Sequence, residues 1–136
     1  LEKRAPRWRQ QPREARRVLK PGGVAVFMDA TTPGSPLLDT WLQGLELLRD
    51  PSHVRNYSLE QWRAMLEAAG LRPGSVSRYR VRLEFSSWVK RMNTPDVHVQ
   101  AIRSLQKRAG VEVTRHFEIE PDGSFVLDAM LMTAQG

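Results

Sequence analysis

The stretch that decides the fold is residues 13–29, which read REARRVLKPGGVAVFMD. Apolar residues stand at helical spacing among its arginines, and Pro12 just before it suits the first turn of a helix. The Gly-Gly pair permits a left-handed helix cap. The run Val24–Met28 is continuously apolar, which is typical of a strand buried on both faces. We therefore expect a helix from Gln11, a turn, and a strand of a covered, largely parallel sheet.

Helix and strand signals alternate along the rest of the chain. Ser35-Pro36 is typical of the cap and first residue of a helix, and Ser58 with Gln61 forms a capping-box pattern. Polarity alternates over Val76–Phe85, as in a half-exposed strand. Together the patterns predict helices over 36–49, 59–69, 86–92 and 95–109, strands over 76–85, 117–120 and 124–132 with a turn at 121–123, and an ambiguous segment over 111–116.

Composition favours one soluble domain. With 136 residues, 40% of them hydrophobic, the chain can bury one sizeable core. It has no cysteine, which excludes disulfides, thiolate zinc sites and cysteine nucleophiles. It has no apolar run of the ~20 residues that cross a bilayer and no signal-peptide pattern. We expect a cytoplasmic protein without membrane contact.

The positive charge lies at one end of the chain. The net charge is +6, and residues 1–20 hold eight Lys and Arg against two Glu, so the remaining residues balance at thirteen against thirteen. Residues 1–10 show no periodicity and are expected to form a basic N-terminal arm on a body of residues 11–136. This pattern lacks the continuous basic face of a nucleic-acid reader, so nucleic acid is not the expected partner.

Residues 13–29 resemble a motif of the class I S-adenosylmethionine-dependent methyltransferases similar to the ubiquinone and menaquinone biosynthesis enzymes, in which a helix ends at LKPGG and leads into the fifth strand. RDPSHVRNYS at 49–58, AAGL at 68–71 and DGSF at 122–125 are similar to later parts of that family. The resemblance maps the chain onto the C-terminal half of a family member. It implies an α/β fold with a partial Rossmann-like methyltransferase sheet, strands five, six and seven, and flanking helices.

The resemblance implies S-adenosylmethionine as the family's cofactor. The family's strand order, 3-2-1-4-5-7-6 with the last strand antiparallel, places the strand at 124–132 between those at 24–28 and 76–85. The glycine-rich loop and the acidic residue that hold the cofactor in the first half of this fold have no counterpart here, since no two of the nine glycines form Gly-x-Gly. We therefore expect this chain alone not to bind the cofactor. Asp29, at the carboxyl end of its strand, is the one cofactor-side candidate, and a loop-capping role is an equal alternative.

One loop gathers polar and ionisable groups. A histidine with a pKa near neutrality can take up the proton released when a nucleophile is methylated. The alternative is that the loop only positions the cap of the next helix. The candidate substrate-binding residues, for a small-molecule substrate in the complete enzyme, are His53, Arg55, Asn56 and Tyr57.

Other ionisable groups are expected to have structural roles. His98 and His116 are isolated from other ligand types, so no metal site is expected. Arg78, Arg80 and Arg82 form one face of a strand, which is expected to be solvated. No catalytic residue can be assigned from spacing, since methyl transfer in this family mainly demands alignment of the reactants.

The leading hypothesis is a methyltransferase segment that contributes the substrate-side half and is inactive alone. The alternative is a non-catalytic dimerisation or binding module derived from a methyltransferase. A homodimer is expected through the exposed edge of the Val24–Met28 strand, because the missing half of the fold would otherwise pair with that edge.

Overall fold

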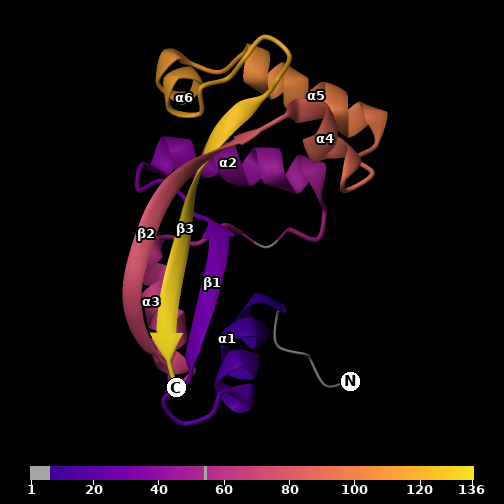
Figure 1. Ribbon diagram of the computed structural model, residues 1–136. Coiled ribbons are helices and arrows are strands. Elements are labelled where there is room, and N and C mark those ends of the chain that lie inside the picture. Colours follow the sequence, from indigo (N-terminus) through magenta and orange to yellow (C-terminus); the bar gives the residue numbers. More distant parts are fainter. Residues whose placement is uncertain (1–6, 54) are drawn as a thin grey trace. The chain divides into compact units, whose positions relative to one another are not determined.

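The computed structural model describes the backbone of residues 7–53 and 55–136, and the side chains of residues 11–53 and 55–136. These residues form helices and strands in mixed order, which is the predicted α/β class (Figure 1). The elements are α1 (Arg7–Val18), β1 (Val24–Ala30), α2 (Pro36–Arg49), α3 (Leu59–Ala68), β2 (Arg72–Leu83), α4 (Phe85–Lys90), α5 (Asp96–Lys107), α6 (Val111–His116) and β3 (Phe125–Gln135).

The three strands form one sheet in the order β1-β3-β2, so the last strand lies in the middle, as expected (Figure 1). The amide of Thr31 donates to the carbonyl of Asp128, and the amide of Gly136 donates to the carbonyl of Gly23. Because the partner numbers fall along β3 as they rise along β1, these two strands run antiparallel. This is the direction that the resemblance implies for the last strand of the sheet, which runs antiparallel to its neighbours.

The chain divides into two compact units, and each strand contributes residues to both. Unit 1 consists of Leu1–Asp29, Tyr57–Arg78 and Met130–Gly136. Unit 2 consists of Ala30–Asn56 and Tyr79–Ala129.

The core of unit 1 lies under α3. The hydroxyl of Ser58 accepts from the amide of Gln61, whose side chain accepts from the amide of Ser58, so the predicted capping box is confirmed. Gly70, with φ +83°, ends the helix in the left-handed conformation. Trp62 and Leu66, between these ends, are buried. They belong to a hydrophobic cluster whose other buried members are Tyr57, Leu71, Met130, Met132 and Ala134.

The core of unit 2 lies against α2. Ser35 caps this helix and Pro36 is its first residue, as the sequence predicts. Trp88 of α4 meets Phe125 of β3 edge to face, with ring centroids 4.9 Å apart. The buried cluster consists of Leu38, Leu42, Leu45, Phe85, Trp88, Ile102, Val113, Phe117, Phe125 and Leu127.

Only one face of β1 is packed in the part of the chain that the structure describes. Phe27 approaches Trp62 with ring centroids 5.8 Å apart, whereas Val24, Val26 and Met28 are 54%, 57% and 66% exposed. The expectation of a strand buried on both faces is therefore wrong for these residues. An apolar run shows that a strand can be covered twice, but it does not supply the second covering layer.

Two further expectations are corrected. Helix α1 begins at Arg7, within the segment expected to be an irregular arm, and it contains Pro12 inside rather than at its start. Residues 117–120 form no strand, although the amide of Gly123 donates to the carbonyl of Glu120 in the expected turn. Phe117 is instead fully buried at the end of α6, and its carbonyl accepts from the amide of Val126.

Candidate functional site

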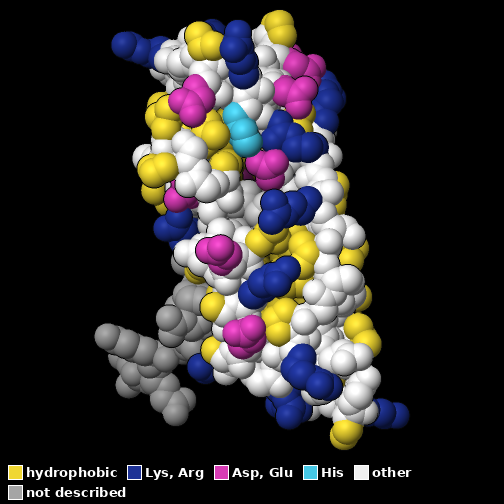
Figure 2. Space-filling model, turned by 90° about the vertical axis from the view of Figure 1, so that its left-hand side faces the viewer, with side chains coloured by type: hydrophobic (Ala, Val, Ile, Leu, Met, Phe, Trp, Pro, Cys, Tyr) yellow, Lys and Arg dark blue, Asp and Glu magenta, His cyan; other side chains and the backbone are white. Residues whose placement is uncertain are grey.

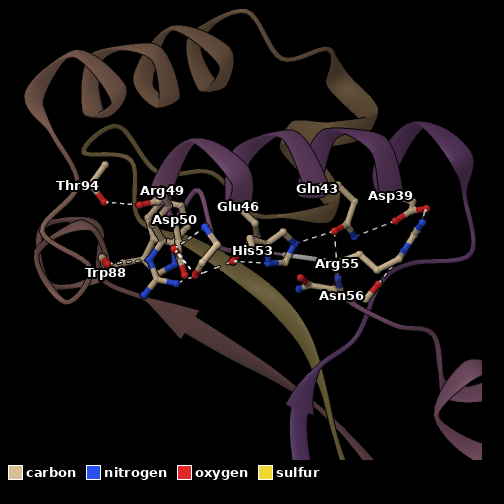
Figure 3. Close-up of polar contacts among 11 residues, drawn as sticks. Asp39, Gln43, Glu46, Arg49, Asp50, His53, Arg55, Asn56, Trp88 and Thr94 are labelled. Carbon is tan, nitrogen blue, oxygen red and sulfur yellow. Dashed lines mark hydrogen bonds and ion pairs between the residues drawn. The ribbon is translucent and has the colours of Figure 1, made fainter. Parts of the chain in front are cut away.

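A polar face of α2 holds the loop that carries the candidate substrate residues (Figure 3). Asp39, Gln43 and Glu46 are spaced four and three residues apart, which places their side chains along one side of the helix. The adjacent side carries the leucines of the unit 2 core. Figure 3 shows these polar side chains directed toward His53, Arg55 and Asn56, so helix and loop form one polar cluster.

Asp39 fixes the end of the loop that carries Arg55. The guanidinium of Arg55 donates to its carboxylate over 2.7 Å, and the amide nitrogen of Gln43 donates over 3.0 Å. Thr32 also donates to this carboxylate. Burial acts to raise the pKa of Asp39, but the hydrogen bonds from its three partners outweigh burial and hold the pKa below its ordinary value. The carboxylate is therefore charged at neutral pH.

Gln43 fixes the middle of the loop. Its side-chain oxygen lies 2.9 Å from Nε2 of His53 and 3.0 Å from the backbone nitrogen of Asn56. Asn56 is itself buried, with 7% of its surface exposed. One amide side chain thus satisfies two groups of the loop, which would otherwise lose hydrogen bonds on burial.

His53 lies in a partly buried place among charged groups. Its side chain is 15% exposed, and Nδ1 lies 4.0 Å from Oε2 of Glu46. Burial lowers the pKa of His53 below its ordinary value, and the charges of Arg49 and Arg55 act in the same direction, against the opposing effect of Asp50. The imidazole is therefore neutral at physiological pH and is able to accept a proton.

The first residues of the loop are anchored in the core of unit 2. Arg49 donates from Nε to the carbonyl of Trp88 over 2.9 Å, and its guanidinium lies 4.9 Å from the centroid of the Trp88 ring. The hydroxyl of Thr94 donates to the carbonyl of Arg49 over 2.9 Å. The start of the loop, like its middle, is therefore anchored by hydrogen bonds.

The structure brings together three of the predicted site residues. His53, Arg55 and Asn56 lie in the polar cluster of unit 2, whereas Asp29 and Tyr57 belong to unit 1. Asp29 is exposed at the end of β1, and Tyr57 is buried in the unit 1 core, with 9% of its surface exposed.

Sequence reasoning missed the helix residues that complete the cluster. Asp39, Gln43 and Glu46 contact or approach the loop residues, yet no short motif marks them. The signal was present in their helical spacing on a segment whose other side is leucine-rich. This spacing did not indicate which residues the three side chains would contact, because the loop lies up to 16 residues further along the chain.

The remaining histidines and the arginine face of β2 have structural partners. His98 lies 3.1 Å from the carbonyl of Leu48 through Nδ1. Figure 2 shows a face on which Lys and Arg side chains alternate with Asp and Glu around a histidine. On β2, Arg80 pairs with Asp128 over 2.9 Å and Arg82 pairs with Glu120 over 2.7 Å. Arg80 and Arg82 therefore have acidic partners, while the face of Arg78, Arg80 and Arg82 is exposed to solvent, as expected from the sequence.

Two other kinds of feature are absent from the described residues. No three His, Asp or Glu side chains there are grouped so that they could hold a metal ion. None of the described helices is long and apolar enough to cross a membrane. The cluster that remains offers a neutral imidazole, a guanidinium and buried hydrogen-bonding groups, which can orient a polar substrate and accept its proton.

The α/β fold of the chain is a methyltransferase fold, shared with part of two solved bacterial structures. The first is the YcgJ protein of Bacillus subtilis, at a TM-score of 0.82 and 34% identity, over 94% of this chain and 57% of that one. The second is BH2331 of Bacillus halodurans C-125, provisionally assigned as a methyltransferase, at a TM-score of 0.83 and 29% identity, over 93% and 57%.

Sequence comparison gives the same relationship. The chain is 45% identical over 122 residues to the uncharacterized protein YafE of Escherichia coli (strain K12), which is 90% of this chain and 59% of YafE. It is 40% identical over 87 residues to the uncharacterized methyltransferase YcgJ of Bacillus subtilis (strain 168), which is 64% of this chain and 34% of YcgJ. No protein-family model matches the chain. The chain thus spans 34% to 59% of the length of these curated relatives and is related to methyltransferases.

Proposed function

We propose that these residues form the substrate-side half of an S-adenosylmethionine-dependent methyltransferase of the cytoplasm, inactive without the cofactor-binding half. The observation that carries the proposal is the asymmetry of the structural match, which includes 94% of this chain but 57% of the YcgJ structure. The part of YcgJ outside the match is the part to which we assign the glycine-rich turn. The family resemblance at residues 13–29 supports the same division.

The described residues do not by themselves fit S-adenosylmethionine. The cofactor of this family needs a glycine turn that lets the backbone approach it closely after a strand. The glycine that follows β1 is Gly34, where a Cβ would meet no protein atom within 4 Å, so the packing of the described residues does not require glycine there. Thr32 in the same loop already donates to Asp39. We therefore assign only an accessory cofactor contact to Asp29.

We assign the polar loop to the small-molecule substrate. His53 is neutral and accepts the proton of the methylated group, while Arg55 and Asn56 orient the substrate through hydrogen bonds. Tyr57 stays a candidate for substrate contact from its position in the sequence, and it belongs to unit 1, where it is buried in the core. The hydrogen bonds of this loop to Gln43 and Asp39 hold it in one conformation, which favours a preformed site.

A hybrid protein tests this division. In YcgJ of Bacillus subtilis, the residues that match this chain are replaced by the matching residues of this chain. We expect the hybrid to fold and to bind S-adenosylmethionine within about tenfold of the parent, a change of about 1.4 kcal/mol or less. Calorimetric titration measures this affinity, with unaltered YcgJ as control. A hybrid that folds and does not bind the cofactor contradicts the proposal.

A second candidate function is a non-catalytic dimerisation module, and the exposed side of β1 favours it. Within the described sheet, β1 is an edge strand, and an edge strand can pair with a strand of another chain. Val24, Val26 and Met28 add an exposed apolar face to that edge. A second copy that pairs along β1 extends the sheet and covers this apolar face.

The double substitution Val26→Lys with Met28→Lys tests the homodimer. We expect the unaltered chain to scatter light as a particle of twice 15.6 kDa and the double variant as a monomer, because two ammonium groups cannot be buried in an apolar interface. Val97→Lys on α5, where the side chain is 68% exposed, is the matched control and leaves the dimer intact. A monodisperse monomer of the unaltered chain at high concentration rules out the homodimer.

A further inference from the structure

The hydrogen bonds of Gln43 fix which end of its amide is the oxygen. The backbone N–H of Asn56 donates to Oε1 over 3.0 Å, and an N–H can donate only to an oxygen here. At the other end, Nε2 donates to Oδ1 of Asp39 over 3.0 Å, and a charged carboxylate accepts only. Two independent partners therefore require the same orientation of the amide (Figure 3).

This orientation decides where the proton of His53 lies. Nε2 of His53 is 2.9 Å from the same oxygen of Gln43, which carries no hydrogen, so Nε2 must be the donor. A neutral imidazole has one N–H, and the other nitrogen then has a free lone pair. We propose that Gln43 is a positioning residue that holds His53 as the Nε2–H tautomer and leaves Nδ1 as its proton-accepting nitrogen.

The surroundings of Nδ1 suit a proton acceptor. Oε2 of Glu46 lies 4.0 Å from Nδ1 and Asp50 adds a second negative charge, whereas burial and the charges of Arg49 and Arg55 lower the pKa and keep the resting ring neutral. A proton taken up at Nδ1 turns the contact with Glu46 into an ion pair. Gln43 and Glu46, one turn apart on α2, thus act on opposite nitrogens of one ring.

The functional use of this arrangement rests on the proposed function, whereas the tautomer does not. In the substrate-side half of a methyltransferase, Nδ1 takes the proton of an O–H or N–H group of the substrate, and Nε2 keeps its proton throughout. Gln43 acts only through His53 and needs no contact with the substrate.

Nitrogen NMR of the ring measures the tautomer directly. The chain is labelled with ¹⁵N-histidine, and long-range ¹H–¹⁵N spectra are recorded at about pH 8, above the ordinary histidine pKa of about 6.5. His53→Gln identifies which of the three histidine spin systems belongs to His53. We expect a protonated Nε2, an unprotonated Nδ1 and a single tautomer.

Substitutions at Gln43 test its role. Gln43→Met keeps the length of the side chain without an acceptor, and we expect it to give a mixture of the two tautomers. Gln43→Glu keeps an acceptor oxygen, so it retains the Nε2–H tautomer and raises the pKa of His53. The matched control is Gln100→Met on the exposed side of α5, which leaves the His53 signals unchanged.

A protonated Nδ1 in the unaltered chain overturns the proposal, as does an unchanged tautomer in a folded Gln43→Met variant. If that variant does not fold, the spectrum of the unaltered chain alone decides. The measurement needs neither cofactor nor substrate. A hybrid that does not bind S-adenosylmethionine therefore overturns the proposed function and leaves the tautomer untouched. A His53 ring protonated at Nδ1, in a chain whose hybrid does bind the cofactor, overturns the tautomer alone.

Discussion

Replacing Trp88 by alanine is expected to lower the free energy of unfolding of unit 2 by about 3–5 kcal/mol, as large core aromatics do. The side chain is 1% exposed and lies at the centre of the unit 2 cluster, edge to face with Phe125. Its removal leaves a cavity, and the guanidinium of Arg49 loses the ring over which it lies. Urea titration followed by far-ultraviolet circular dichroism measures the change.

Two variants make this result interpretable. Val97→Ala truncates a side chain that is 68% exposed, and we expect its free energy of unfolding to stay within about 0.5 kcal/mol of that of the unaltered chain. Trp88→Phe keeps a smaller ring, so we expect its free energy of unfolding to lie between those of Val97→Ala and Trp88→Ala. A loss below about 1 kcal/mol for Trp88→Ala contradicts a well-packed core at this position.

The loop anchored by Arg49 connects this stability to the candidate site. Arg49 donates to the carbonyl of Trp88 and ends the helix whose polar face holds His53 and Arg55. A substitution at Trp88 in the core of unit 2 is therefore expected to affect the loop through the contact between Trp88 and Arg49.

Local signals were sufficient for most of the helices. Ser35-Pro36 and the Ser58 capping box each act within four residues, and the structure confirms both starts. The end at Gly70 depends only on a residue that adopts positive φ without strain, and it is confirmed as well. The ambiguity over residues 111–116 is resolved as helix α6, whose Val113 is buried in the unit 2 core.

Features that depend on distant partners were not predictable in the same way. The apolar run in β1 indicated two covered faces, but which face is covered depends on segments that pack on it, not on the strand itself. The loop at 53–57 was singled out from composition, whereas its contacts with Gln43 and Asp39 required the tertiary structure. The role proposed for these loop residues stays a prediction.

The remaining expectation concerns the cofactor and depends on what the chain does not encode. In the family that residues 13–29 resemble, the glycine turn and the ribose-binding acid supply most of the polar contacts with S-adenosylmethionine. No Gly-x-Gly occurs among the nine glycines of this chain. What remains is β1, with the exposed carboxylate of Asp29 near its end, and the loop after it, where the hydroxyl of Thr32 already donates a hydrogen bond to Asp39.

The 136-residue chain alone is therefore expected to bind S-adenosylmethionine at least about a hundredfold more weakly than the hybrid. Each lost hydrogen bond costs about 0.5–1.5 kcal/mol net, and a factor of a hundred corresponds to about 2.7 kcal/mol, so the loss of three or four bonds is enough. No methyl transfer is expected, because reactants that are not held in place lose the gain from alignment. Calorimetric titration of the chain and of the hybrid under one buffer measures the ratio. Micromolar binding by the chain alone contradicts this expectation and requires a cofactor site built from residues other than the family's glycine turn.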